Sequence, residues 1–151
     1  MNASGGDIEG GWSLAAPSRT APGGMAIRID GTGNTLELQA GYIVGGKVAA
    51  AGGGNILALG GPADGTFDLS KIVSSLDDTT GAEQYQGFDV YEKTGLGTWT
   101  ATGKVADAHP WAVEQSTLAL GASGDLSQAS DVGVDATLDA SGVLTGSTTV
   151  Q

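Results

Sequence analysis

The chain is divided by the stretch Thr66-Phe-Asp-Leu-Ser-Lys-Ile-Val-Ser-Ser-Leu-Asp-Asp78. Four of its apolar residues have the i, i+3, i+4, i+7 spacing of one helix face: Leu69, Ile72, Val73 and Leu76. Thr66 or Asp68 can cap the amino end, because either side-chain oxygen can accept a hydrogen bond from an amide one turn later. The spacing therefore predicts one short α-helix over residues 66–78.

On both sides of this helix, short apolar/polar alternations are separated by glycine-rich turns. Residues 25–39 predict a β-hairpin around Gly31–Asn34, and residues 86–105 and 132–150 predict two more. No fixed-period repeat is evident. Strands at intervals of 8–12 residues favour an antiparallel β-sandwich or a small β-barrel. The predicted fold is thus mainly β, and the helix is expected to plug one open end.

Residues 1–24 form a predicted extended arm, and residues 25–151 form a predicted single β domain. The arm contains six glycines, two prolines and only three large apolar side chains, those of Ile8, Trp12 and Leu14. Such a segment is expected to be disordered unless it folds back on its own domain or lies on a neighbouring subunit. In an assembly Trp12 would be the anchor, whereas in a monomer it would cap the core. Ile8, Trp12 and Leu14 are therefore the candidate partner-contact residues.

The composition limits both the core and the partners. Leu, Ile, Val and Phe total 31 of 151 residues, close to the range in which disorder is expected, so the isolated chain should be marginally stable unless partners add buried surface. The net charge of −11 disfavours nucleic acid and anionic membranes as partners. It suits solubility or a basic protein partner. The amino terminus lacks the features of a secretory signal, and no window approaches 18 apolar residues.

No residue pattern indicates catalysis. The absence of cysteine excludes thiolate chemistry. The single histidine, His109, could act as a general base, but the sequence contains no Gly-x-Ser-x-Gly motif to supply the serine nucleophile. The adjacent carboxylates Asp77 and Asp78 point apart on a helix, which disfavours glycoside hydrolysis. The glycine-rich run 45–48 lacks the residues of a phosphate-binding loop. We therefore expect no enzyme activity and no cofactor.

No metal site is expected either. The loop Asp30–Asn34 resembles a calcium loop only faintly, since it lacks a third acid and the bidentate glutamate. Asp131, Asp135 and Asp139 recur every four residues. On a single strand the outer two would lie more than about 25 Å apart, too far to share one ion.

The overall profile resembles the capsid decoration (cement) proteins of tailed bacteriophages. The resemblance is carried by the cysteine-free, acidic, Gly/Ala/Thr-rich β domain and by the segment Thr-Ala-Pro-Gly-Gly, residues 20–24, between the arm and the first strand. It implies a small β fold, often trimeric, that binds the major capsid protein on the capsid exterior and reaches neighbouring subunits through its arm. The expected location is therefore the virion surface, after synthesis in the host cytoplasm.

Two alternatives stay open. Tail-tube and fibre proteins share much of this composition, so another part of the virion is an alternative location. A carbohydrate-binding or adhesin-type module is an alternative function, in which Tyr91, Trp99 or Trp111 would stack on a sugar ring.

Overall fold

The computed structural model describes residues 24–76, 83–105, 110–126 and 131–141, together with the backbone of residues 2–3 and 7–9. These residues form sixteen strands and one 3-10 turn. The strands are β1 (Asn2–Ala3), β2 (Asp7–Glu9), β3 (Met25–Asp30), β4 (Thr35–Gln39), β5 (Ile43–Gly45), β6 (Lys47–Ala51), β7 (Ile56–Gly60), β8 (Gly65–Asp68), β9 (Ile72–Val73), β10 (Tyr85–Gln86), β11 (Val90–Lys93), β12 (Trp99–Thr102), β13 (Trp111–Val113), β14 (Ser116–Leu120), β15 (Asp131–Val132) and β16 (Ala136–Asp139).

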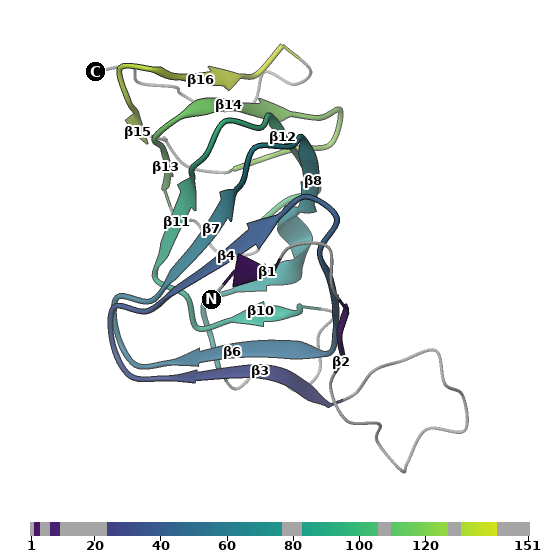
Figure 1. Ribbon diagram of the computed structural model, residues 1–151, viewed down its shortest axis with the longest axis vertical. Helices are drawn as coiled ribbons and strands as arrows, with labels where there is room; N and C mark the ends of the chain where they lie inside the picture. The colour runs from purple at the N-terminus through teal and green to yellow at the C-terminus, as the bar shows by residue number, and fades with distance from the viewer. Residues whose placement is uncertain are drawn as a thin grey trace.

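The strands form three larger sheets and one strand pair, and every pairing between them is parallel (Figure 1). The first sheet has the order β1-β4-β7-β11-β13-β15, the second β3-β6-β10-β9 and the third β16-β14-β12-β8, while β2 pairs with β5. Except for β9 and β10, which pair with each other in the second sheet, consecutive strands belong to different sheets and pair with strands of neighbouring coils. This architecture is a parallel β-solenoid.

The prediction of an antiparallel sandwich or barrel is wrong. β3 and β4 were expected to form a hairpin, but β3 pairs with β6 and β4 pairs with β7. Likewise β11 and β12 pair with strands of the coils before and after them, and β15 pairs with β13 while β16 pairs with β14. The glycine turns between consecutive strands are corners of a coil. Residues 143–150, the expected partner strand of the last predicted hairpin, lie outside the described residues.

No fixed-period repeat was expected, and the spacing between paired strands does vary, but two successive coils share a motif. Leu36 pairs with Leu57, 21 residues later, and the pattern Gly-x-Gly-Asn-x-Leu-x-Leu occurs at residues 31–38 and again at 52–59. Gly31 and Gly52 have matching φ values of 114° and 116°, a region that favours glycine. A Cβ at Gly52 would lie 2.3 Å from the carbonyl oxygen of Gly31, so the stacked corners require this residue.

Residues 66–78 do not form the predicted helix. They contain the end of β8, a 3-10 turn at Leu69–Lys71 (η1), and β9. The predicted cap is correct in its chemistry, since Asp68 Oδ1 accepts a hydrogen bond from the Ser70 amide at 3.0 Å. Leu69 and Ile72 are fully buried, but Leu76 is 44% exposed, so the four apolar residues do not share one buried face. Asp77 and Asp78 lie outside the described residues.

The core consists of columns of inward side chains that stack from coil to coil. Strand alternation directs every second side chain inward, and parallel pairing places equivalent positions on top of one another. Tyr91 stacks on Trp111 with ring centroids 5.4 Å apart, and both lie in the column that begins with Leu36 and Leu57. These four side chains are at most 1% exposed. A single continuous core therefore runs the length of the solenoid.

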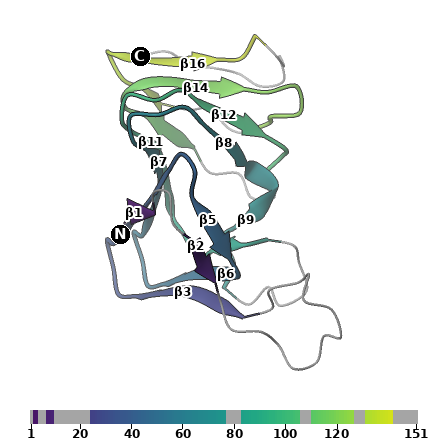
Figure 2. The ribbon, with the colours of Figure 1, turned by 45° about the vertical axis from the view of Figure 1, so that its right-hand side comes forward.

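Two short strands of the predicted arm belong to this fold. β1 pairs with β4, and β2 pairs with β5, so both strands lie against the first coil of their own chain (Figure 2). Ile8, one of the three candidate contact residues, stands opposite Val44 in the β2–β5 register. Trp12 and Leu14 lie outside the described residues.

Candidate binding surface

The outward side of the third sheet carries a regular array of threonines, which we call the threonine face. In β12, Trp99 and Ala101 point into the core and are fully buried, so Thr100 and Thr102 point outward. Thr98, directly before β12, continues this alternation. Neighbouring strands add the other members of the array, Thr66 from β8, Thr117 from β14 and Thr137 from β16. Six of the nine threonines within the described residues lie on this face.

Strand register arranges these side chains in rows that run across the sheet. Thr66 stands opposite Thr100, which is followed by Ala119 and then by Asp139. Thr117 stands opposite Thr137 in the adjoining row, and Thr98 continues that row because Trp99 pairs with Leu118. Strands lie about 4.8 Å apart, and alternate residues of one strand about 6.7 Å apart. The face is therefore a two-dimensional grid of threonine side chains, with Ala119 inside it and Asp139 at its edge.

An open pocket of about 380 Å³ adjoins this face at the edge strand β8. It is lined by Ala40, Gly41, Tyr42, Asp64, Gly65, Thr66 and Trp99. The Tyr42 ring is half-buried and stacks on the indole of Trp99 with centroids 6.3 Å apart. Gly65 packs directly on the same indole, since a Cβ there would lie 2.8 Å from Trp99 Cζ3. Asp64 and Thr66 connect the pocket to the threonine face.

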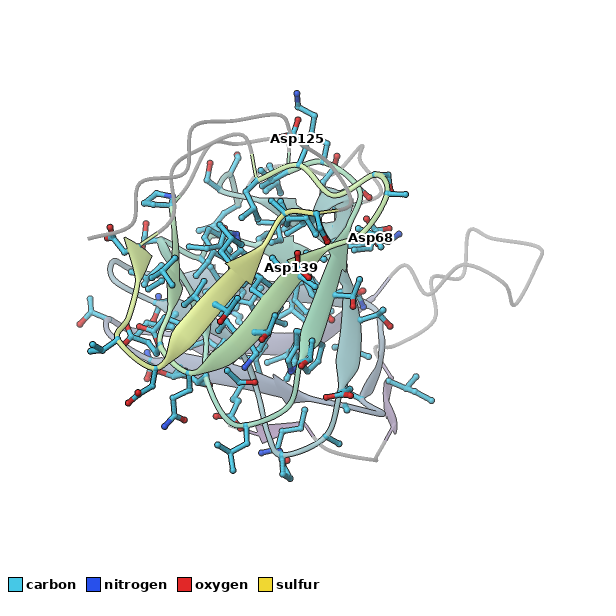
Figure 3. All side chains as sticks on the ribbon, turned by 90° about the horizontal axis from the view of Figure 1, so that it is seen from above. Asp68, Asp125 and Asp139 are labelled. Carbon is cyan, nitrogen blue, oxygen red and sulfur yellow. The ribbon has the colours of Figure 1, made fainter. Side chains whose placement is uncertain are left out.

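Acidic groups lie at the edges of the threonine face, and the exposed Lys104, two residues after β12, is paired with Asp125. Asp64 Oδ1 accepts a hydrogen bond from the Thr98 amide at 2.7 Å, and Asp68 accepts from the Ser70 hydroxyl at 2.6 Å. Figure 3 labels Asp139 and Asp68, which belong to the two edge strands of this sheet, β16 and β8. The Ser141 amide donates to Asp139 and holds the pKa of that carboxyl below its usual value. None of the residues in β8, β12, β14 and β16 is basic.

Lys93 is the one fully buried cation within the described part of the chain, and it has a structural environment. It follows Leu38 and Leu59 in a core column and precedes Val113. Its Nζ donates to the carbonyl oxygens of Thr94, Gly95 and Gln115 at 2.7, 3.0 and 3.1 Å. Burial lowers the pKa of Lys93. Two of these bonds hold the corner that follows Lys93 itself and the third joins it to the next coil, so all three donors are used and this lysine offers no free ammonium for chemistry.

Asn55 has a comparable role at a corner of the coil. It is fully buried, and its Oδ1 accepts hydrogen bonds from the amide and from Nδ2 of Asn34 at 3.0 and 3.1 Å. Its Nδ2 donates to the carbonyl oxygens of Gly31 and Gly52, both at 3.0 Å. The side chain thus joins two successive corners and uses every donor it has.

The structure changes the assessment of several sequence-based candidates. Tyr91, Trp99 and Trp111, considered as sugar-stacking residues, are at most 1% exposed, so their rings cannot stack on a ligand in solvent. Asp131 lies in β15 and Asp139 in β16, with Asp135 in the turn between them, so the three do not share a strand. His109 lies outside the described residues.

The described residues contain no group of three or more His, Asp or Glu side chains that could hold a metal ion. The Asp30–Asn34 loop is the corner between β3 and β4, where Asp30 accepts a hydrogen bond from Arg28 Nε at 2.9 Å. Among the described residues no helix is long and apolar enough to cross a membrane. Comparison with protein-family models, with curated proteins and with solved structures finds no match to this chain.

The threonine face was not recognised from the sequence. The alternation Thr98-x-Thr100-x-Thr102 is visible there, but a face exists only once β8, β12, β14 and β16 are known to stack in parallel. In the expected antiparallel hairpins these residues would have had other neighbours. Tyr42 and Asp64, which line the pocket, carry no motif at all.

Proposed function

We propose that this protein is a non-enzymatic structural module, a rigid solenoid segment that works as part of a larger assembly. The observation that carries the proposal is how the buried polar side chains are used. Lys93 and Asn55 direct their hydrogen bonds to the backbone of successive coils. A catalytic site would instead direct such groups toward a cleft where substrate can bind.

The proposed setting is a tailed-phage virion, where the chain would decorate the capsid exterior or form part of a tail or fibre. Its partners would be the major capsid protein and further copies of the chain, in a homotrimer. The net charge of −11 supports an outward-facing position away from DNA. The solenoid differs from the sandwich or barrel expected with the cement-protein resemblance, so the fold does not support the virion setting. The support comes from the net charge and from the structural use of the buried side chains of Lys93 and Asn55.

The test is to mix the full chain with expanded phage capsids and to measure co-sedimentation. Binding at a fixed ratio to the major capsid protein is expected, together with a trimer in light scattering. A chain lacking residues 1–24 is the matched variant. It loses β1 and β2 but should keep most of its β-sheet circular dichroism signal, because the buried core cluster lies within residues 27–126, and it should lose capsid binding. A full chain that stays monomeric and does not bind capsids would contradict the proposed setting.

A further inference from the structure

We propose that the threonine face and the adjoining pocket together bind a linear glycan that carries no acidic groups. This role goes beyond that of a structural module, because it assigns a ligand to one particular face of the solenoid. A solenoid can serve as a scaffold without binding a glycan, so a failure of the glycan proposal would leave the proposed structural role intact.

The hydroxyl grid matches the chemistry of a sugar chain. Each threonine hydroxyl can both donate and accept a hydrogen bond, as each sugar hydroxyl can. One row contains Thr98, Thr117 and Thr137. The next contains Thr66 and Thr100, followed by Ala119 and Asp139. A chain lying across the strands between these rows would meet a new pair of side chains at every strand, about 4.8 Å further on. That interval is close to the length of one pyranose unit.

The array is held in position before any ligand binds. Beneath Thr98, Thr100 and Thr102 lie Trp99 and Ala101, both fully buried in the core. Threonine is β-branched and has restricted side-chain rotation on a strand. A ligand therefore orders few side chains on binding, which lowers the entropic cost of association.

Charge selects among glycans. Asp64, Asp68 and Asp139 lie at the edges of the grid, and its strands contain no basic residue. Lys71 and Lys104 follow β8 and β12, and Lys104 is already paired with Asp125. An acidic polymer would be repelled, whereas a neutral or an amino-bearing polymer would not. The charge of the face thus complements a linear glycan that lacks carboxylate and sulfate groups.

The pocket gives such a chain a place to begin. Half-buried Tyr42 is fixed by its stacking on Trp99, so one aromatic ring contributes to a hollow of about 380 Å³. The carboxylate of Asp64 and the hydroxyl of Thr66 line the same hollow. A mainly polar hollow with one aromatic ring suits a hydroxyl-rich ligand.

The experiment is calorimetric titration of the full chain with three hexameric probes: cellohexaose, a glucosamine hexamer and a galacturonate hexamer. The test variant is Thr100→Val/Thr117→Val, which removes two hydroxyls and keeps β-branched side chains. The matched control is Thr35→Val, an outward threonine of β4 on the first sheet. Circular dichroism of all three proteins checks that the fold is unchanged.

Cellohexaose and the glucosamine hexamer should bind, and the galacturonate hexamer should not. The double variant should lose about tenfold in affinity, as expected for two hydrogen bonds, while Thr35→Val should bind as the natural chain does. Three results would overturn the proposal: no binding of any probe, equal binding by the double variant, or preference for galacturonate. Inhibition of ice recrystallisation without glycan binding would assign the grid to ordered water and would overturn it too.

Discussion

Lys93 shows how a single residue can replace an aliphatic side chain in the core. It stands where neighbouring coils have Leu59 and Val113, and its ammonium reaches three carbonyl oxygens. Lys93→Met fills a similar volume but leaves those carbonyls without this donor. We expect unfolding in urea to show a loss of about 2 kcal/mol.

The matched control for this substitution is Lys104→Met. Lys104 is exposed and forms a 3.2 Å ion pair with Asp125, and surface pairs of this kind contribute at most about 1 kcal/mol. A Lys93→Met variant as stable as the natural protein would show that the three carbonyls find other donors or water.

Burial of tyrosine gives the protein a defined response to alkali. Burial raises the pKa of Tyr85 and of Tyr42 above the ordinary value of 10.0. The unfolded chain therefore loses these protons first, and their contribution to stability is complete below pH 10 and falls as the pH rises through the folded pKa. Tyr85→Phe should reduce the fall in unfolding free energy above pH 10 by up to about 1.4 kcal/mol per pH unit.

Urea unfolding at a series of pH values would measure this effect. Tyr42 keeps its own contribution, so the variant should retain part of the alkaline fall. Identical pH profiles for the natural and Tyr85→Phe proteins would contradict the expectation.

The corners between strands pack closely on the corners of the neighbouring coil. At Gly97, between β11 and β12, a Cβ would lie 2.0 Å from the carbonyl oxygen of Ala63 in the coil below. Because backbone atoms of two stacked corners cannot separate cheaply, Gly97→Ala should lower the free energy of unfolding by about 2–3 kcal/mol. Gly53→Ala is the control, since a Cβ there meets nothing within 4 Å. Equal stability of the two variants in thermal melts would show that the corners are looser than described.

Element positions could be predicted from the sequence, but their partners could not. Alternation such as Leu36-x-Leu38 marks a strand in a hairpin and in a solenoid alike, because side-chain direction has period two in both. A short glycine turn likewise serves a hairpin or a coil corner. The signal that distinguishes them is the 21-residue repeat of Gly-x-Gly-Asn-x-Leu-x-Leu, which is interrupted after two copies by the 34-residue step from Leu57 to Tyr91.

The helix prediction failed for a related reason. Leu69 and Ile72 have helical spacing, and the prediction that they are buried is correct. A 3-10 turn followed at once by a strand buries them equally well, because parallel partners for β9 and β10 supply the backbone hydrogen bonds that a helix would have supplied. The threonine face depends on this arrangement of coils, so it could not be predicted from the sequence pattern either.

At the scale of the molecule, charge opposes compaction. A net charge of −11 on 151 residues repels itself more strongly in the folded state than in the expanded chain. Raising the salt concentration from about 0.01 M to about 0.15 M shortens the Debye length from about 30 to about 8 Å, so Tm should rise by a few degrees. Differential scanning calorimetry in NaCl measures this shift, and a Tm that falls with salt would contradict the expectation.

The order of strands in the second sheet constrains how the chain can assemble. β9 precedes β10 along the chain, yet β10 lies between β6 and β9 in the sheet. During synthesis residues 72–73 emerge from the ribosome before residues 85–86. β9 therefore remains unpaired, or pairs with another strand, until β10 is available. The solenoid therefore cannot be completed one coil at a time from the amino terminus. Its second sheet is completed only after Gln86 has emerged, whereas the earlier pairs β3–β6 and β4–β7 need no later residue.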